Sequence, residues 1–343
     1  MRIYLIGYPS DLGGANTEAW HTLRLWREGG LEVHALPTWR ATEPWRKRLD
    51  AIGVITHDVP EKELTNFTPL RGAVCVSFCN DAFLRVVPRL RALDCRLVWV
   101  NCMTWLFDAE RRLYDRYGPF DAYVFQSNFQ RTALEPEMAV FGYQAHQGHT
   151  IRGAFSLDEW EFRPRPFHGS GSFVVGRLAR PDPDKWHARM WEIYARIDYP
   201  ERKAKVMGWN GKVDWKCGPP PKWATCLRPN AEKTQDFFAD LHCLLTVNGG
   251  ARENWPRIGL EAMAAGVPIV TENRWGWQEM IEHGKTGLLA NSEEELSHHT
   301  STLARDPALR MRLIHAARHH LLELCNPQRL YTSWSRLFAS LAA

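Results

Sequence analysis

The chain has 343 residues, enough for two domains of ordinary size that each have a hydrophobic core. Hydrophobic residues make up 45% of it and charged residues 24%, a composition that excludes a disordered chain and is typical of a soluble globular protein. The formal net charge is a mild +4, and no apolar run reaches the length of a membrane span. Because the first residues lead into a strand pattern and not into a signal peptide, we expect a cytoplasmic location.

The eight cysteines are scattered along the chain, and none of their spacings suits a zinc site or a redox CxxC pair. Buried free thiols are expected instead, which fits a reducing compartment. The histidine pairs at 298–299 and 319–320 fall in predicted helices that lack carboxylates at metal-ligand spacing. We therefore predict that the protein has no metal site.

Strand and helix patterns alternate in the first half of the sequence. Such alternation is typical of a parallel sheet covered by helices on both faces, with ligands at the carboxyl ends of the strands. Gly13 and Gly14 stand at the mouth of the first helix, without the G-x-G-x-x-G spacing of a dinucleotide site. Ser127 is placed to cap a later helix. The predicted strands are residues 2–7, 31–36, 73–78, 96–101 and 122–125, and the predicted helices are 15–27, 81–91 and 104–116.

A stretch rich in proline, glycine and serine, residues 166–172, has the composition of a linker between two domains. Beyond it, a strand is predicted at 172–176, a second ends at Gly208, and a third, buried strand covers 241–245. Close approach of the backbone to a ligand and a plain turn both explain Gly208. Helical patterns at 293–304 and 307–322 follow.

The segment around Glu253 and Glu261 is the most informative part of the second half. Pro256 stands where a helix begins, and Gly266 stands where that helix must end, just before a β-branched run at 267–271. One carboxylate therefore lies in the loop before the helix and the other in its second turn. Both can face a ligand at the helix N-terminus, where unpaired N–H groups and the helix dipole favour phosphate.

Residues 253–268 read ENWPRIGLEAMAAGVP, which resembles the Glu-x7-Glu signature of the retaining GT-B glycosyltransferases of the family 4 type. The next segments, WGWQE at 275–279 and GKTGLL at 284–289, look like this family's Gly-Gly-x-Pro-Glu and Gly-x-x-Gly-Leu-Leu. Residues 176–186 are similar to its Gly-Arg-Leu motif and the Lys-Gly that follows. The resemblance covers nearly the whole chain and is strongest between residues 151 and 289.

This resemblance implies the GT-B fold, an α/β architecture in which two Rossmann-like domains with parallel sheets face each other across a cleft. Residues 151–164 are similar to the family's crossing between its domains, next to the linker described above. The first domain is expected to comprise residues 1–155 on the acceptor side, with the last helix, 327–343, packing back on it. The second domain, 156–326, is expected to bind the nucleotide sugar.

The implied activity is transfer of a sugar from a nucleotide-diphospho sugar, with retention at the anomeric carbon. Arg177 and Lys185 match the two cations that hold the diphosphate, and such preorganised charge stabilises a departing diphosphate strongly. The resemblance gives Glu253 the donor-sugar hydroxyls and the oxocarbenium-like state, and Glu261 the ribose hydroxyls. The other implied donor-binding residues are Gly13, Gly14, Gly208, Asn254, Trp255, Pro256 and Arg257.

The sequence departs from the family pattern at three of these places, and the first is the loop 180–183 before Lys185, which makes the spacing a couple of residues longer than usual. Asn101 occupies the end of a strand where many relatives have a histidine near the donor sugar, and its amide could still hydrogen-bond a hydroxyl. Pro256 replaces the usual glycine and removes one N–H donor from the helix mouth. The contacts to the donor are therefore expected to differ locally from those of the family.

The resemblance implies no cofactor beyond the nucleotide-diphospho sugar, with UDP- or GDP-sugar expected, and no metal, since the cations can do a metal's electrostatic work. The acceptor is not identified: a glycan, a lipid-linked molecule and nucleic acid all stay open. Basic residues bunch in the first half, which leaves room for peripheral contact at the inner membrane surface. Two alternatives to transfer are a GT-B nucleotide-sugar epimerase and a noncatalytic relative that binds nucleotide or polyanion.

Overall fold

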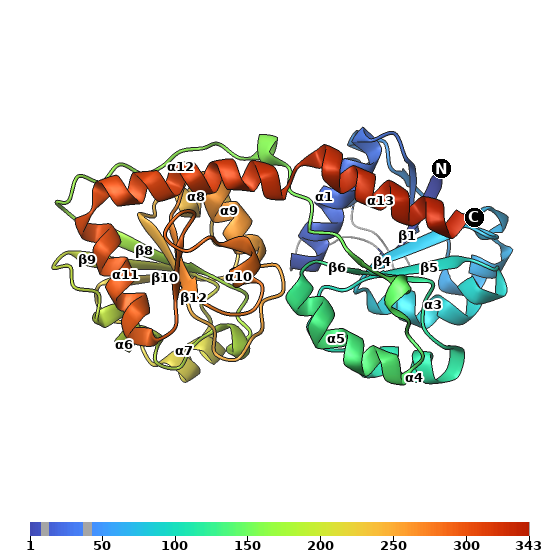
Figure 1. Cartoon of the computed structure of the whole chain (residues 1–343), viewed down its shortest axis with the longest axis horizontal. Helices are drawn as coiled ribbons and strands as arrows, with labels where there is room; N and C mark the ends of the chain where they lie inside the picture. The colour runs from blue at the N-terminus through green and yellow to red at the C-terminus, as the bar shows by residue number, and fades with distance from the viewer. Residues whose placement is uncertain (8–13, 37–42, 343) are drawn as a thin grey trace. The chain divides into compact units, whose positions relative to one another are not determined.

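The computed structural model describes residues 1–7, 14–36 and 43–342. The chain divides into two compact units. Unit 1 contains Met1–Phe155 together with the C-terminal segment that starts at Cys325, and unit 2 is the continuous segment Ser156–Leu324. Both units are α/β structures built on a parallel sheet, as Figure 1 shows. The predicted fold class, two Rossmann-like domains with parallel sheets, is thereby confirmed.

The sheet of unit 1 has seven strands in the order β3-β2-β1-β4-β5-β6-β7, and every neighbouring pair is parallel. Apolar residues fill its four central strands, which explains why both faces of the sheet are covered by helices. The strands are β1 (Arg2–Ile6), β2 (Glu32–Leu36), β3 (Ile55–Thr56), β4 (Val74–Phe78), β5 (Arg96–Val100), β6 (Ala122–Phe125) and β7 (Gly148–Thr150).

The α-helices of unit 1 include one that comes from the far end of the chain. This C-terminal helix, α13, packs against α1: the rings of Trp26 and Trp334 are 4.9 Å apart in an edge-to-face arrangement, and Phe338 lies 5.3 Å from Trp26. The α-helices are α1 (Gly14–Glu28), α2 (Glu43–Ala51), α3 (Asp81–Ala92), α4 (Asp108–Tyr117), α5 (Asn128–Val140) and α13 (Pro327–Ala342), with 3-10 turns at Glu61–Asn66, Thr68–Leu70 and Ala145–Gln147.

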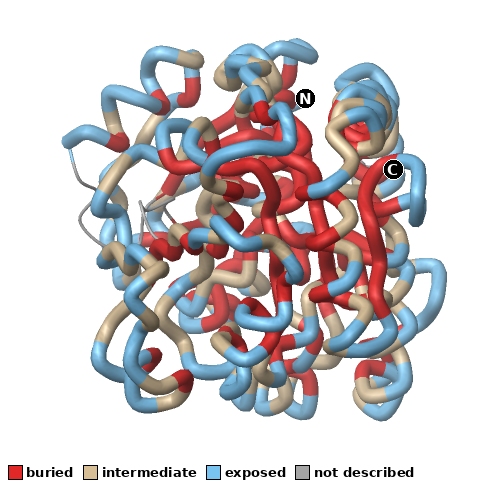
Figure 2. Tube along the Cα trace, turned by 90° about the vertical axis from the view of Figure 1, so that its left-hand side faces the viewer, coloured by how far each residue is buried: buried red, intermediate tan, exposed pale blue. Residues whose placement is uncertain are grey.

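The sheet of unit 2 has six strands in the order β10-β9-β8-β11-β12-β13, again parallel throughout. Its strands are β8 (Phe173–Leu178), β9 (Arg202–Met207), β10 (Ala224–Leu227), β11 (Cys243–Thr246), β12 (Ile269–Glu272) and β13 (Leu288–Ala290). Its helices are α6 (Met190–Ala195), α7 (Gly211–Cys217), α8 (Thr234–Ala239), α9 (Arg257–Ala265), α10 (Trp277–Met280), α11 (Glu293–Arg305) and α12 (Pro307–Leu324), with 3-10 turns at Leu157–Glu159 and Pro183–Lys185. Figure 2 shows that the buried residues lie mainly in the inner part of the trace and the exposed residues mainly on its outer turns.

Several local predictions are confirmed. Ser127 caps α5, since its hydroxyl accepts a hydrogen bond of 3.0 Å from the Gln130 N–H. Gly266 ends α9 in the left-handed conformation, with φ of 84°. Other boundaries differ: the helix predicted from residue 104 starts at Asp108, and the strand predicted to end at residue 176 runs on to Leu178. Residue 177 is therefore part of a sheet and not of a loop.

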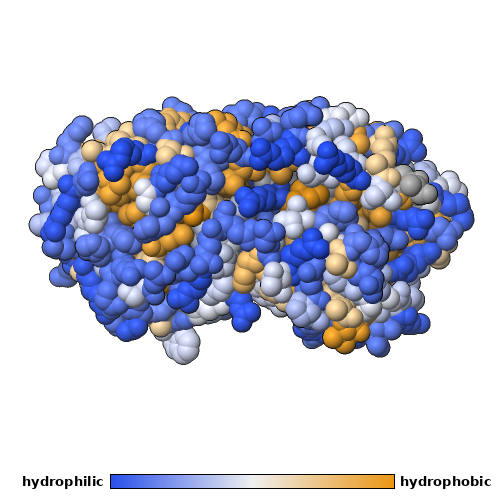
Figure 3. Space-filling model, in the orientation of Figure 1, coloured by the Kyte–Doolittle hydropathy of each residue, from blue (hydrophilic) through white to orange (hydrophobic). Residues whose placement is uncertain are grey.

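The described residues contain no helix that is both long and apolar enough to cross a membrane. Hydrophilic residues cover most of the face of each unit that Figure 3 shows. All eight cysteines are free thiols. The expectation of free thiols is confirmed.

A buried carboxyl in unit 1 gives the first testable prediction. Glu110 is only 1% exposed, and its carboxyl accepts hydrogen bonds from the Phe107 N–H at 2.8 Å and the Tyr114 hydroxyl at 3.0 Å. Burial raises the pKa of Glu110 from 4.5 to about 7, and the bond from Phe107 opposes this rise only partly. The folded protein therefore holds this proton more tightly than the unfolded chain does.

Between about pH 4.5 and 7 the folded state binds more protons at Glu110, so the contribution of this group to stability falls as the pH rises. A Glu110→Gln variant should lack this slope. Relative to the variant, the natural protein should lose up to about 3 kcal/mol in its free energy of unfolding as the pH rises over that range. Urea unfolding at several pH values measures it. Glu63→Gln, at an exposed position, is the control, and equal slopes in all three proteins would contradict the prediction.

Candidate functional site

Arg177 lies on β8 and is one of the most deeply buried charged residues described, with 2% of its surface exposed. Its guanidinium donates to the Thr246 hydroxyl, to the Lys185 carbonyl, and to the Asn248 side-chain oxygen at 3.0 Å. The Trp186 ring lies under it, 5.5 Å from the guanidinium carbon to the ring centroid. This arginine therefore holds the ends of β8 and β11 and the turn around Lys185 together.

The surroundings of Arg177 bear on its charge. Burial lowers the pKa of the guanidinium from its ordinary value, while Tyr194, Glu253 and Glu272 oppose this shift electrostatically. The guanidinium stays protonated, since arginine titrates far above neutral pH. Its Nε is buried and has no hydrogen-bond partner among the described residues. A buried positive charge with a spare N–H is thus held at the carboxyl end of the sheet.

Lys185 and Glu253 are brought together by two different loops. The Lys185 Nζ lies 2.9 Å from the Glu253 Oε1, and both side chains are about one-fifth exposed, 20% and 18%. Lys185 closes the 3-10 turn Pro183–Lys185, and Glu253 lies in the loop between β11 and α9. The predicted cation and the predicted carboxylate therefore pair with each other.

Backbone contacts fix the loop that carries Glu253. The Asp184 carbonyl accepts hydrogen bonds from the N–H groups of Gly249 at 2.9 Å and Ala251 at 3.0 Å. On the other side, the Gly276 N–H donates to the Glu253 carbonyl at 2.8 Å. A Cβ on Gly276 would lie only 1.7 Å from the Asn254 carbonyl oxygen, so glycine is required there. The loop is held from both sides, which orients Glu253.

Helix α9 presents Glu261 and Arg257. Pro256 is its N-cap residue and makes no side-chain cap hydrogen bond. Burial raises the pKa of the Glu261 carboxyl, and the positive charge of Arg257 opposes this rise. Both residues lie in unit 2, on the helix that directly follows the Glu253 loop.

The other predicted residues are placed as follows. Asn254 and Trp255 are buried beside Glu253. Gly208, with φ of 104°, follows β9, and a Cβ there would lie 1.8 Å from the Ala179 carbonyl oxygen, so protein packing alone requires this glycine. Gly14 starts α1 and is exposed. Gly13 falls outside the described residues.

Asn101 belongs to unit 1, directly after β5. It is 3% exposed, and its side-chain nitrogen donates to the Val124 carbonyl at 3.4 Å, while its own carbonyl accepts from Gln130 at 3.0 Å. The structure therefore groups Arg177, Lys185 and Glu253 with the start of α9 within unit 2, and it describes Asn101 as part of the other unit.

Sequence reasoning missed the residues that hold Arg177. Thr246 and Asn248 accept its hydrogen bonds, and the Asn248 N–H donates to the Glu272 carboxylate at 3.1 Å. The sequence did offer an indication, because Thr246 and Asn248 directly follow the predicted buried strand 241–245, at the edge of the sheet where ligand-binding residues gather. Among the described residues, no three His, Cys, Asp or Glu side chains are grouped as a metal site would need.

The sequence of unit 2 can be compared with known families once this geometry is in place. Residues 158–320 match the model of the family described as glycosyl transferases, group 1. The match spans most of unit 2 and includes Arg177, Lys185, Glu253 and Glu261. Unit 2 thus carries the sequence pattern of a group 1 glycosyltransferase domain.

Solved structures are similar over both units. Anabaena HepE in complex with UDP-glucose matches with a TM-score of 0.78 and 16% identity, covering 99% of this chain and 100% of that one. A mutant of S. aureus TarM in complex with Fondaparinux, alpha-GlcNAc-glycerol and UDP gives 0.73 and 10%, covering 98% and 99%. Sucrose-phosphate synthase from Thermosynechococcus elongatus gives 0.71 and 14%, covering 99% and 98%. At these identities the likeness establishes the GT-B fold.

Proposed function

We propose that this protein is a glycosyltransferase that moves a sugar from a nucleotide-diphospho sugar to an acceptor, with retention at the anomeric carbon and without a metal. The observation that carries the proposal is the group 1 glycosyltransferase match over residues 158–320, because the Lys185–Glu253 pair and the buried Arg177 lie inside it. In this proposal unit 2 binds the donor and unit 1, completed by α13, faces the acceptor.

The donor is proposed to be a UDP-sugar, with a GDP-sugar as the second choice. Anabaena HepE is described in complex with UDP-glucose and with UDP, and the S. aureus TarM mutant in complex with UDP. These proteins share the fold of this chain but only 10–16% of its residues, so the base is a hypothesis that needs its own test.

The leaving diphosphate is proposed to take over the contacts of Lys185. A diphosphate carries more charge than one carboxylate, so Lys185 can exchange Glu253 for a phosphate oxygen when the donor binds. Arg177 contributes its positive charge from a buried position, where three hydrogen bonds tie the guanidinium to Thr246, Lys185 and Asn248. N–H groups at the start of α9 add to the stabilisation of the charge that develops there.

The exchange frees the carboxylate of Glu253. It can then accept hydrogen bonds from the hydroxyls of the donor sugar and stabilise positive charge in an oxocarbenium-like state. Glu261, on the second turn of α9, is proposed to accept from the ribose hydroxyls. The remaining proposed donor contacts are Gly13, Gly14, Gly208, Asn254, Trp255, Pro256 and Arg257, with Asn101 near the transferred sugar.

The acceptor side is proposed more broadly. Basic residues of unit 1, such as Arg46, Lys47, Arg89 and Arg112, fit an anionic glycan, a lipid-linked acceptor at the inner membrane surface, or nucleic acid. The eight free thiols favour a reducing compartment, so we place the reaction in the cytoplasm.

Donor binding is the direct test of the proposal. A thermal-shift series with UDP, GDP, ADP, dTDP and UDP-glucose should show a rise in melting temperature with UDP and UDP-glucose above all. At a concentration about 100 times the Kd, binding adds about 2.7 kcal/mol to stability, which is several degrees for a domain of this size. An unchanged melting temperature with every nucleotide would contradict nucleotide-sugar transfer.

Product analysis separates transfer from its alternatives. NMR of the product should show the anomeric configuration of the donor sugar on an acceptor. An altered nucleotide sugar formed without an acceptor would indicate an epimerase, and calorimetric donor binding without turnover would indicate a noncatalytic protein. Binding to DNA that weakens steeply with salt would point to nucleic acid as acceptor.

A further inference from the structure

A pocket in unit 2 shares no lining residue with the proposed donor site. Its volume is about 300 Å³, at the lower end of the range of small-molecule sites, roughly 300–1,000 Å³. It lies at the carboxyl ends of β11, β12 and β13, beside the start of α11. Val247, Ala290 and Leu296 supply apolar lining, while Asn248, Glu272 and Glu293 supply hydrogen-bonding groups. The pocket is large enough for one small ring and its substituents.

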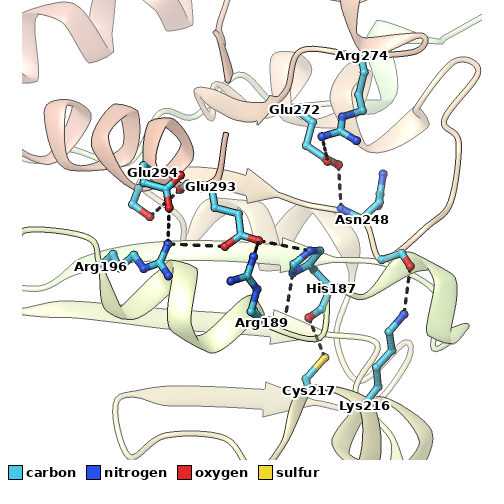
Figure 4. Close-up of polar contacts among 12 residues, drawn as sticks. His187, Arg189, Arg196, Lys216, Cys217, Asn248, Glu272, Arg274, Glu293 and Glu294 are labelled. Carbon is cyan, nitrogen blue, oxygen red and sulfur yellow. Dashed lines mark hydrogen bonds and ion pairs between the residues drawn. The ribbon is translucent and has the colours of Figure 1, made fainter. Parts of the chain in front are cut away.

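The carboxylates around this pocket are each paired with a guanidinium group. Glu272 pairs with Arg274 at 3.2 Å, Glu293 pairs with Arg189, and Glu294 pairs with Arg196 at 3.0 Å. Figure 4 shows Glu272 between Arg274 and Asn248, and Glu293 in contact with His187, Arg189 and Arg196. Three carboxylates thus oppose three guanidinium groups. A charged ligand would compete for one partner of such a pair and leave the other charge unpaired. This pairing therefore favours a neutral ligand.

The polar groups keep hydrogen-bonding capacity despite this pairing. Each carboxylate oxygen accepts up to two hydrogen bonds. The Glu272 Oε2 accepts from the Asn248 N–H at 3.1 Å. The Glu293 Oε1 accepts from Arg189 and lies 3.7 Å from the His187 Nε2, while its Oε2 is buried, 3.6 Å from the Arg196 Nη1. The lone pairs that remain on the Glu272 carboxylate and on the Glu293 Oε1 are suited to accept hydrogen bonds from the hydroxyl groups of a ligand.

Trp275 gives the pocket an aromatic wall. Its backbone is left-handed, with φ of 57°, which is rare for a bulky side chain, and Arg274 lies over its ring at 5.3 Å from the centroid. An indole face packs well against the C–H face of a ring that carries hydroxyls on its edge. Trp275 thus adds an apolar surface beside the carboxylates of Glu272 and Glu293, which can accept hydrogen bonds from hydroxyl groups.

We propose that this pocket is a binding site for a neutral, monosaccharide-sized polyol, separate from the nucleotide-sugar site. Glu272 and Glu293 accept from its hydroxyls, Asn248 hydrogen-bonds another, and Trp275 packs against its ring. Asn248 also accepts from Arg177 at 3.0 Å, so an occupied pocket contacts a residue that holds the donor site together. This site goes beyond the proposed function and does not depend on it.

The probes are glucose, galactose, mannose and N-acetylglucosamine, titrated by ligand-observed NMR in the presence of saturating UDP. At least one of them should bind, and Glu293→Gln and Trp275→Gly should each weaken it at least tenfold. Glycine at position 275 suits the left-handed backbone, so that variant removes the ring without new strain. A cooperative thermal unfolding transition close to that of the natural protein shows that each variant is folded.

Two matched controls make the test specific. Glu294→Gln removes the neighbouring carboxylate, whose side chain is 75% exposed and lies outside the pocket lining, and it should leave hexose binding unchanged. Glu253→Gln should also leave it unchanged. The proposal is overturned if no probe binds, if only Glu253→Gln weakens binding, or if glucose 6-phosphate or glucosamine binds more tightly than glucose. Hexose binding without any response to UDP would contradict the proposed function but not this site.

Discussion

A Glu253→Gln variant should fold normally, bind UDP as the natural protein does, and lose about 100- to 1,000-fold in kcat for sugar transfer. Glutamine keeps the shape of the side chain and can still accept from Lys185, which lies 2.9 Å from the Glu253 Oε1. It removes the negative charge that is proposed to stabilise the developing positive charge on the sugar. The loss should therefore fall on kcat and not on donor affinity.

The measurement is donor consumption under saturating UDP-sugar, together with calorimetric binding of UDP. Glu161→Gln, whose carboxylate is exposed and pairs only loosely with Arg163 at 3.4 Å, is the matched control and should retain full activity. If Glu253→Gln transfers sugar at nearly the natural rate, the assignment of this carboxylate is wrong even though the fold and the family match stand.

The second large effect concerns Gly276. A Gly276→Ala variant would place a Cβ 1.7 Å from the Asn254 carbonyl oxygen and 2.9 Å from that of Glu253. The backbone must move apart, and the hydrogen bond from the Gly276 N–H to the Glu253 carbonyl is then weakened. We expect a loss of about 1–3 kcal/mol in stability. Since a displacement of about 1 Å costs on the order of 100-fold in rate, activity should fall more than stability suggests.

Thermal unfolding and the donor-consumption assay measure the two effects. Gly211→Ala is the control: this glycine starts α7, and a Cβ there meets nothing within 4 Å. Alanine favours the helix, so stability should stay the same or rise slightly. A Gly276→Ala protein that matches Gly211→Ala in both measurements would show that the contact between the two loops does not position Glu253.

Much of the architecture can be read from patterns along the chain. Buried strands such as Val74–Phe78 and Arg96–Val100 are mostly apolar, apart from Ser77 and the exposed Arg96, and α9 has a proline at its start and a glycine at its end. No helix or strand is predicted in the segment 211–227, although it forms α7 and β10. Its helix and strand are short. The prolines at 219–221 and the 86% exposed Trp215 also interrupt the hydrophobic periodicity on which such predictions depend.

The site residues illustrate a different limit. Motif similarity could point to Arg177, Lys185 and Glu253, but it could not show that the lysine and the glutamate pair with each other, nor that the arginine is buried and tied to Thr246 and Asn248. These contacts join segments that are about 70 residues apart, as in the Arg177–Thr246 bond. A local sequence pattern cannot predict a contact between two residues that are so far apart along the chain.

The order in which the chain visits its two units has a practical consequence. Unit 2 is one uninterrupted stretch, Ser156–Leu324, so a single gene fragment encodes all of it. Unit 1 is different, because Trp334 and Phe338 of the final helix pack on Trp26 near the beginning. A shortened clone that stops at residue 155 would expose that indole and lose its neighbours. To produce unit 1 alone, residue 155 should instead be joined to residue 325 by a short glycine-serine linker, because this retains the final helix and its packing on Trp26.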